Sequence, residues 1–151
     1  MEEIRIQIKR VRLSPTPLPL PAYMTEGSAG VDLYADIEND IELAPNERAL
    51  IQTGIAVALP VGFEAQIRPR SGLALKHGLT MVNSPGTIDS DYRGEIQLIV
   101  INFGQKPIII RRGQRIAQMI IQRVIKARWE EVSELPASER QDEGFGHTDK
   151  K

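Results

Sequence analysis

The chain has 151 residues, of which 41% are hydrophobic, and its 19 Lys and Arg residues nearly balance its 20 Asp and Glu residues. This length predicts one domain, and a net charge of −1 excludes the basic excess that drives binding to nucleic acids or membrane surfaces. The absence of cysteine excludes disulfides, thiol nucleophiles and zinc–thiolate sites and is typical of a reducing compartment.

The amino-terminal residues alternate between apolar and polar types. Ile4, Ile6 and Ile8 are separated by polar side chains, which indicates a half-buried strand. This stretch lacks the continuous apolar core of a signal peptide, and no segment reaches the ~20 apolar residues of a membrane span, so we expect a cytoplasmic protein. The four prolines within Ser14–Tyr23 exclude a helix or a central strand there.

Short strand candidates bounded by turn residues fill most of the remaining chain. The segment 71–78 could form one or two turns of helix, and no longer helical period is present. Many short strands with Gly and Pro turns predict an all-β sandwich or barrel. The strand candidates are 30–36, 41–44, 48–59, 63–68, 79–82, 95–103, 108–111 and 115–124.

Two features bear on assembly and domain organisation. The stretches "IIIR" and "IAQMII" are apolar without alternation, so both faces need cover, either from the rest of the core or from a neighbouring subunit. The periodicity stops after Val132. We therefore expect a single β domain over residues 1–132 and a flexible polar tail over residues 133–151, with Phe145 as a lone aromatic between glycines.

The segment Gly86–Ile96 concentrates charge and turn residues in one hairpin. It carries the carboxylates Asp89, Asp91 and Glu95. A loop carboxylate commonly serves turn geometry, but Asp89 follows an apolar residue and lies six residues after Asn83 in a loop shaped by Gly and Pro. A carboxylate in such a place can hold and deprotonate a water molecule, which contributes a factor of about 100 to 10,000 in rate.

Other segments combine cations, hydroxyls and glycines, the groups that suit phosphate oxygens. One is Arg70-Ser71-Gly72, a short motif that also occurs by chance, and another is Arg140 followed by "GFGHT". The stretch "RRGQRIAQM", considered alone, favours a basic turn leading into a strand. No P-loop occurs, and His77 and His147 are too isolated to indicate a metal site.

The order of five segments resembles the motifs of the homotrimeric dUTP diphosphatases (dUTPases). The segments are "SAGVDLYA", "PRSGLALKHG", "NSPGTIDSDYRGEI", "RRGQRIAQM" and "RQDEGFGHT", and the match runs from about Ala29 to Thr148. The resemblance implies a jelly-roll-like or distorted β-barrel subunit that forms a homotrimer with active sites at subunit interfaces. It also implies hydrolysis of dUTP to dUMP and diphosphate with Mg2+. This reaction would limit uracil incorporation into DNA and supply dUMP for dTMP synthesis.

The resemblance further implies residue roles. Asp89 would activate the water that attacks the α-phosphorus, and Asp32 would lie near the metal through water. The expected uracil and deoxyribose contacts are Asn83, Gly86, Ile88, Tyr92, Phe145 and Gly146, with Tyr92 excluding a 2′-hydroxyl and Phe145 stacking on uracil. The expected phosphate contacts are Arg70, Ser71, Gly72, Gln118, Arg140, His147 and Thr148.

The tail departs from the glycine-rich pattern of the family. Gln141, Asp142 and Glu143 stand where flexible residues are expected, His147 replaces a serine, and Asp149 replaces the last glycine. Added negative charge beside a polyanion predicts weaker closure, and hence slower turnover or weaker affinity than a glycine-rich tail would give. A dCTP deaminase of the same superfamily and a non-catalytic trimeric scaffold are the two alternative functions.

Overall fold

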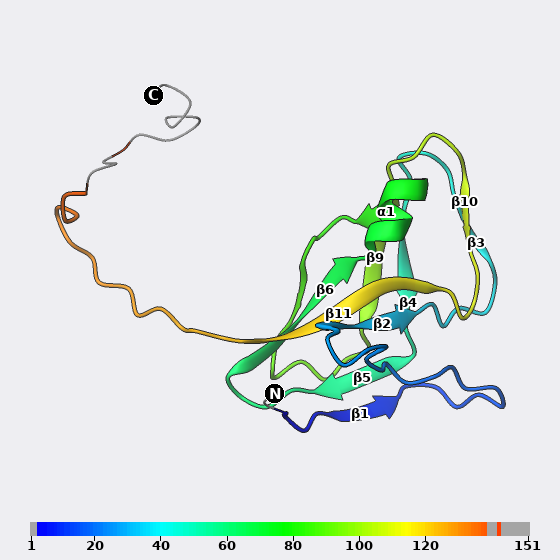
Figure 1. Ribbon diagram of the computed structural model, residues 1–151, viewed down its shortest axis with the longest axis horizontal. Coiled ribbons are helices and arrows are strands. Elements are labelled where there is room, and N and C mark those ends of the chain that lie inside the picture. The colour runs from blue at the N-terminus through cyan, green and yellow to red at the C-terminus, as the bar shows by residue number, and fades with distance from the viewer. Residues whose placement is uncertain (1–2, 139–141, 143–151) are drawn as a thin grey trace.

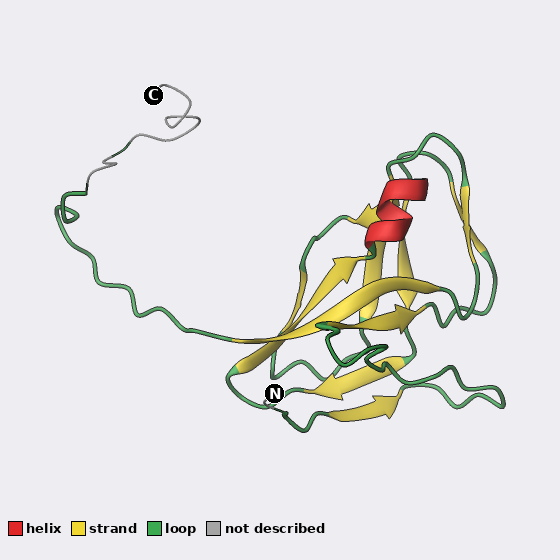
Figure 2. Cartoon of the chain, in the orientation of Figure 1, coloured by secondary structure: helices red, strands yellow, loops and turns green. Residues whose placement is uncertain are grey.

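This computed structural model describes residues 3–138 and residue 142, in which the regular structure is almost entirely β (Figures 1 and 2). One short helix, α1, spans Ser71–His77. The strands are β1 Gln7–Arg10, β2 Gly30–Tyr34, β3 Ile41–Leu43, β4 Arg48–Gln52, β5 Ile55–Ala58, β6 Phe63–Pro69, β7 Leu79–Met81, β8 Gly86–Ile88, β9 Gln97–Asn102, β10 Ile108–Ile110 and β11 Arg115–Arg123. The prediction of an all-β fold is confirmed.

The strands pair in antiparallel fashion across chain-distant segments. A four-stranded sheet has the order β2-β11-β6-β8, and a three-stranded sheet has the order β4-β9-β7. β1 pairs with β5, and β10 pairs with β3. Alternation along β9 buries Leu98 and Val100 and exposes Gln97 and Ile99, so one face of its sheet closes the core and the other faces outward.

The sequence located most strands, with two differences. The candidate 48–59 is two strands, because the chain turns at Gly54 with a φ of 71°. A Cβ at Gly54 would lie 2.2 Å from Oδ2 of Asp36, so this turn requires glycine. β8 was not expected as a separate strand, since its three residues lie inside a segment dominated by turn chemistry.

The strand β11 shows what covers the apolar run "IAQMII". Ile116 and Ala117 are both buried although they are adjacent, and the register of β11 with β2 shifts at this point, as in a β-bulge. Met119 is also buried, so the chain's own core covers β11 on both faces. On β10, by contrast, Ile110 is buried while Ile109 remains 40% exposed.

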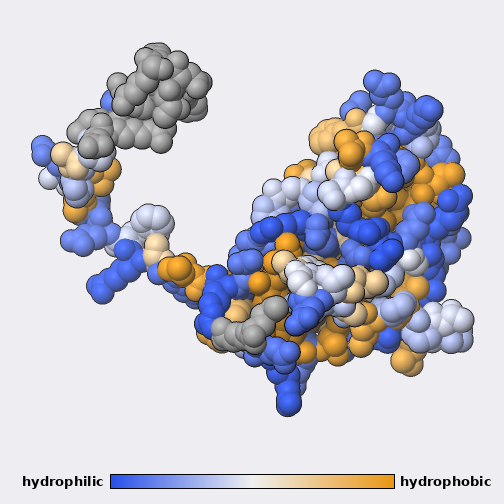
Figure 3. Space-filling view, in the orientation of Figure 1, coloured by the Kyte–Doolittle hydropathy of each residue, from blue (hydrophilic) through white to orange (hydrophobic). Residues whose placement is uncertain are grey.

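Beyond β11 the chain leaves the body of the domain. Residues 124–138 are extended and form no helix or strand, and they lead away from the sheets (Figures 1 and 2). Ile125, Trp129 and Leu135 on this segment are 94%, 91% and 85% exposed, and apolar surface recurs along it (Figure 3). In the described ranges, no helix is long and apolar enough to cross a membrane.

Candidate functional site

The segment Gly86–Ile96 was expected to be a hairpin, but β8 pairs with β6 whereas β9 pairs with β4 and β7, so the segment connects two different sheets. We keep the word hairpin for this connecting segment. A cavity of about 290 Å³ opens between it and the outward face of the β4-β9-β7 sheet. We call it the hairpin cavity. It brings together all five described residues that were expected to contact the nucleoside or the attacking water. Its lining residues are Leu50, Ile67, Met81, Asn83, Gly86, Thr87, Ile88, Asp89, Tyr92, Glu95, Gln97 and Ile99.

Backbone geometry sets the floor and rim of the hairpin cavity. Gly86 is buried on β8, and a Cβ there would lie 3.0 Å from Nδ2 of Asn83, so glycine lets the amide side chain lie against the strand. Asp89 follows β8 at once and is exposed. The backbone N–H of Tyr92 donates to the Asp89 carbonyl at 3.1 Å, which closes the turn that places both residues on one rim.

Glu95 ends the hairpin, and its carboxylate accepts three hydrogen bonds from two residues. Arg12 donates to Oε1 at 2.8 Å and to Oε2 at 2.9 Å, and the backbone N–H of Gly54 donates to Oε1 at 2.8 Å. Burial alone would raise the pKa of Glu95, but these hydrogen bonds and the Arg12 charge together lower it. The same contacts with Glu95 raise the pKa of Arg12, so both groups are charged at neutral pH.

A second cavity lies at the start of α1, and we call it the helix cavity. It is lined by Asp32, Arg70, Ser71, Gly72, Leu73, Lys76, His77 and Gln118. It therefore contains every described residue that was expected to contact phosphates or the metal. Arg70 Nε lies 3.0 Å from Asp32 Oδ1, and Arg115 Nη1 lies 3.1 Å from Asp32 Oδ2.

Gln118 supports the helix cavity as well as lining it. It lies opposite Asp32 on β2 and Arg68 on β6, at the centre of the four-stranded sheet. Its Nε2 donates to the Pro69 carbonyl at 2.9 Å, just before α1 begins. A Cβ at Gly30 would lie 2.9 Å from Oε1 of Gln118, so glycine makes room for the side chain. One amide N–H remains for another acceptor.

The two cavities share no lining residue, so one chain keeps the two predicted sets of contacts apart. The expected tail residues Arg140, Phe145, Gly146, His147 and Thr148 lie outside the described residues.

Sequence reasoning missed several lining residues. Lys76 adds a cation to the helix cavity, and its position four residues after Gly72, one helical turn on, was a usable signal. Leu50 and Ile99 lie directly opposite each other on β4 and β9 and line the hairpin cavity. Nothing local in the sequence indicates that these two outward-facing strand positions border the hairpin.

Comparison with known proteins decides the family. The dUTPase family model matches residues 16–149. The chain is 58% identical over 145 residues to the deoxyuridine 5'-triphosphate nucleotidohydrolase of Caldanaerobacter subterraneus subsp. tengcongensis, covering 96% of this chain and 97% of that protein.

The chain belongs to the dUTPase family.

A more distant relative agrees with this assignment. The deoxyuridine 5'-triphosphate nucleotidohydrolase of Ehrlichia canis is 54% identical over 145 residues, with 95% of each chain covered.

Solved structures of dUTPases share the fold. The Staphylococcus bacteriophage 80alpha dUTPase G164S mutant with dUpNHpp has a TM-score of 0.84 at 24% identity, covering 95% of this chain and 98% of that one. The same phage dUTPase with dUPNHPP has a TM-score of 0.82 at 25% identity, covering 94% and 96%. The chain thus has the all-β, jelly-roll-like fold of dUTPases.

Proposed function

We propose that this chain, a dUTP diphosphatase by family, hydrolyses dUTP to dUMP and diphosphate with a water molecule that Asp89 holds. The carboxylate takes a proton from the water as its oxygen bonds to the α-phosphorus. The bond from the α-phosphorus to the oxygen bridging the β-phosphorus breaks, and diphosphate leaves. The observation that carries this proposal is the position of Asp89, exposed on the rim of the hairpin cavity beside the nucleoside set.

The hairpin cavity supplies the groups that would select deoxyuridine. Asn83 offers an amide that can both donate to and accept from a pyrimidine edge, and Gly86 and Ile88 offer main-chain groups at the β8 edge. Tyr92 is 44% exposed on the same rim, where its ring would pack against the deoxyribose and leave no room for a 2′-hydroxyl.

The helix cavity supplies the groups that would hold the triphosphate. Arg70 offers a guanidinium, Ser71 a hydroxyl and Gly72 an unobstructed backbone N–H, with Gln118 behind them. Phosphoryl transfer depends mainly on positioning and charge neutralisation, which these groups provide.

Membership of the dUTPase family indicates dependence on a divalent metal, and we propose Mg2+. Among the described residues, no cluster of three or more Asp, Glu or His side chains could hold a metal. Asp32 already contacts Arg70 and Arg115. This donor set fits Mg2+ bound mainly by substrate phosphates, with Asp32 acting through water. When bound, Mg2+ would neutralise charge on the triphosphate.

We also propose that the protein works as a homotrimer with active sites at subunit interfaces. The separation of the hairpin cavity from the helix cavity supports this, because a second copy could bring the two sets together. Exposed apolar side chains offer surface for such contacts: Leu50 and Val82 beside the hairpin cavity are 54% and 53% exposed. The division into a β domain over 1–132 and a closing tail over 133–151 stays a prediction, as does the cytoplasmic location.

The tail residues keep their proposed roles, with Phe145 and Gly146 on uracil and Arg140, His147 and Thr148 on the phosphates. Hydrolysis of dUTP would limit uracil incorporation into DNA and supply dUMP for dTMP synthesis.

The decisive experiment is diphosphate release with Mg2+ from dUTP, dTTP, dCTP and UTP. Turnover confined to dUTP supports the proposed selection of uracil and deoxyribose. Ammonia release from dCTP would instead identify a deaminase. Absence of any turnover, together with retained nucleotide binding, would identify a scaffold and overturn the proposal.

A further inference from the structure

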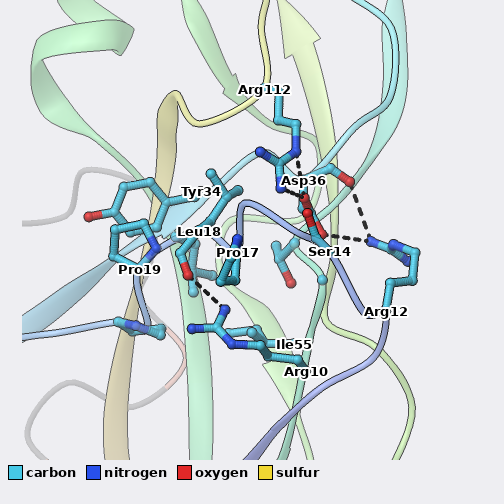
Figure 4. Close-up of a pocket in the computed structure, with 14 residues that line it drawn as sticks. Arg10, Arg12, Ser14, Pro17, Leu18, Pro19, Tyr34, Asp36, Ile55 and Arg112 are labelled. Atoms are coloured by element: carbon cyan, nitrogen blue, oxygen red, sulfur yellow. Dashed lines mark hydrogen bonds and ion pairs between the residues drawn. The ribbon is translucent and has the colours of Figure 1, made fainter.

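A connected group of charges extends from Glu95, which lines the hairpin cavity, through Arg12 and Asp36 to Arg112. Arg12 bridges Glu95 and Asp36, with Nη2 at 2.8 Å from Glu95 Oε1 and at 3.4 Å from Asp36 Oδ2. Arg112 continues the group through Asp36 Oδ1 at 3.0 Å. Figure 4 shows Arg12 and Arg112 approaching Asp36 from different segments.

Glu95 is the member of this group that belongs to the hairpin. Its side chain is 12% exposed, whereas that of Arg12 is 36% exposed. Two charge-assisted hydrogen bonds from one guanidinium fix the carboxylate in orientation as well as position. The Gly54 N–H adds a third contact from the β4–β5 turn. Glu95 is therefore tied to two segments outside its own hairpin.

The backbone of Glu95 in turn holds the side chain of Tyr92. Tyr92 Oη donates to the Glu95 carbonyl at 2.9 Å. A Cβ at Gly94 would lie 2.3 Å from Tyr92 Oη and 2.5 Å from Cζ, so the end of the ring rests directly against the Gly94 backbone. The Tyr92 hydroxyl is thus held by the carbonyl of Glu95, and the side chain of Glu95 is held by Arg12. We call this hydrogen bond of the hydroxyl the anchor of the ring.

We propose that the Arg12–Glu95 ion pair is a positioning device for Tyr92 and sets the discrimination between deoxyribose and ribose. Glu95 touches neither the water nor the phosphates in the proposed mechanism; it acts through the ring that its carbonyl anchors. A ring that can retreat from the cavity leaves space for a 2′-hydroxyl. This inference rests on the proposed function, because it assumes that Tyr92 packs against the sugar.

The test compares kcat/KM for dUTP and for UTP in the full-length protein with Mg2+. Glu95→Gln keeps the shape of the side chain and removes its charge. We expect the dUTP-to-UTP ratio to fall about 10- to 100-fold, the range expected when a positioned group moves by up to an ångström. Tyr92→Phe, which removes the hydroxyl anchor, should lower the ratio similarly, and the double variant should fall no further than the larger single effect.

Arg112→Gln is the matched control, because Arg112 contacts Asp36 and the Thr16 carbonyl without touching the hairpin. It should lower the unfolding temperature and leave the dUTP-to-UTP ratio unchanged. All variants are assayed well below their unfolding temperatures, so a merely structural role would not move the ratio. Should Glu95→Gln fail to fold, Arg12→Lys, which keeps the charge and loses the paired contact, should lower the ratio in the same direction.

The outcomes separate this inference from the proposed function. A folded Glu95→Gln variant with the wild-type ratio, or strictly additive effects with Tyr92→Phe, would overturn the positioning role. An unchanged ratio in Tyr92→Ala would overturn both the anchor and the proposed role of Tyr92. If the wild type hydrolysed no dUTP, the proposed function would fail, and the anchor would be judged by the ratio of dissociation constants for non-hydrolysable dUTP and UTP analogues.

Discussion

Asp89 is the residue on which the proposed chemistry depends most directly. Asp89→Asn keeps the size of the side chain and removes its ability to accept a proton from water. We expect kcat for dUTP to fall about 100- to 10,000-fold, the range of a positioned general base. Affinity for a non-hydrolysable dUTP analogue, measured by calorimetry, should change little. A fall in affinity that matches the fall in kcat/KM would make Asp89 a binding residue instead.

Asp91, which is exposed two residues further along the same turn, provides the control. Asp91→Asn removes an equal charge outside the hairpin cavity lining. Its kcat should stay close to that of the wild type. An equal loss in both variants would assign the effect to the charge of the hairpin as a whole.

Glu95 makes the free energy of unfolding depend on pH in the acid range. Its pKa is lowered in the folded state, because the Arg12 and Gly54 hydrogen bonds outweigh the effect of burial, whereas in the unfolded chain it is about 4.3. The ionised carboxylate therefore stabilises the fold fully above that unfolded value, and this contribution is lost as pH falls through the lower folded pKa. At neutral pH, Glu95→Gln should cost about 1.5–3 kcal/mol, the range for hydrogen bonds to a charged group.

Urea unfolding of wild type and Glu95→Gln at a series of pH values measures this dependence. The difference in unfolding free energy should be constant above about pH 5 and shrink towards pH 3. A difference that did not change with pH would show that the charge of Glu95 adds nothing to stability.

The strand β9 depends on one buried amide. Asn102 is 0% exposed. Its Nδ2 donates to the carbonyls of Leu43 at 3.0 Å and Lys106 at 2.8 Å, and its Oδ1 accepts from the Gly104 N–H at 2.8 Å. These contacts join the end of β9 to β3 and to the turn before β10.

Asn102→Ala would remove all three hydrogen bonds and leave a void at a fully buried position. We expect a loss of about 2–4 kcal/mol in unfolding free energy, because each hydrogen bond contributes about 1 kcal/mol and the void adds to the loss. The exposed amide of Gln97 on the same strand is the comparison, and Gln97→Ala should change stability by less than about 0.5 kcal/mol. Similar unfolding midpoints for the two variants would contradict this account of β9.

Apolar patterning and turn residues predicted nine strand segments, which cover every strand except β8 because one of them spans both β4 and β5. β8 was missed because it is only three residues long and lies among turn residues, and its pairing with β6 depends on the fold and not on local sequence. Gly54 shows the same limit at a turn: its positive φ could be suspected from the sequence, but the Asp36 carboxylate that excludes a Cβ is brought there by the fold.

The candidate site was predictable to a similar extent. Motif order predicted Asp89, Tyr92 and Arg70, which line the two cavities, and their roles stay predictions. The partner of Glu95 was not visible, since Arg12 lies 83 residues away in the chain. Local sequence patterns therefore predict which residues belong to a candidate site. They do not predict the contacts between distant segments that hold those residues in place.

At the scale of the whole molecule, the proposed trimer can be tested by the activity of mixed variants, without measuring its mass. Asp89→Asn damages the hairpin cavity and Arg70→Ala damages the helix cavity, which share no residue. Each variant alone should be nearly inactive. If each active site takes its hairpin from one subunit and its phosphate groups from another, mixed trimers contain some sites with both parts intact.

Equal amounts of the two variants, unfolded together and refolded, should regain about one quarter of wild-type activity. In randomly mixed closed trimers, the hairpin of a site is intact in half of the cases and its phosphate groups are intact in half, so about one site in four has both parts intact. Mixing the folded variants without unfolding should regain less, since stable trimers exchange subunits slowly. Each variant refolded alone is the control. If co-refolding restores nothing while both variants form oligomers, the two cavities of a single chain must serve the same site, and the interface arrangement would be wrong.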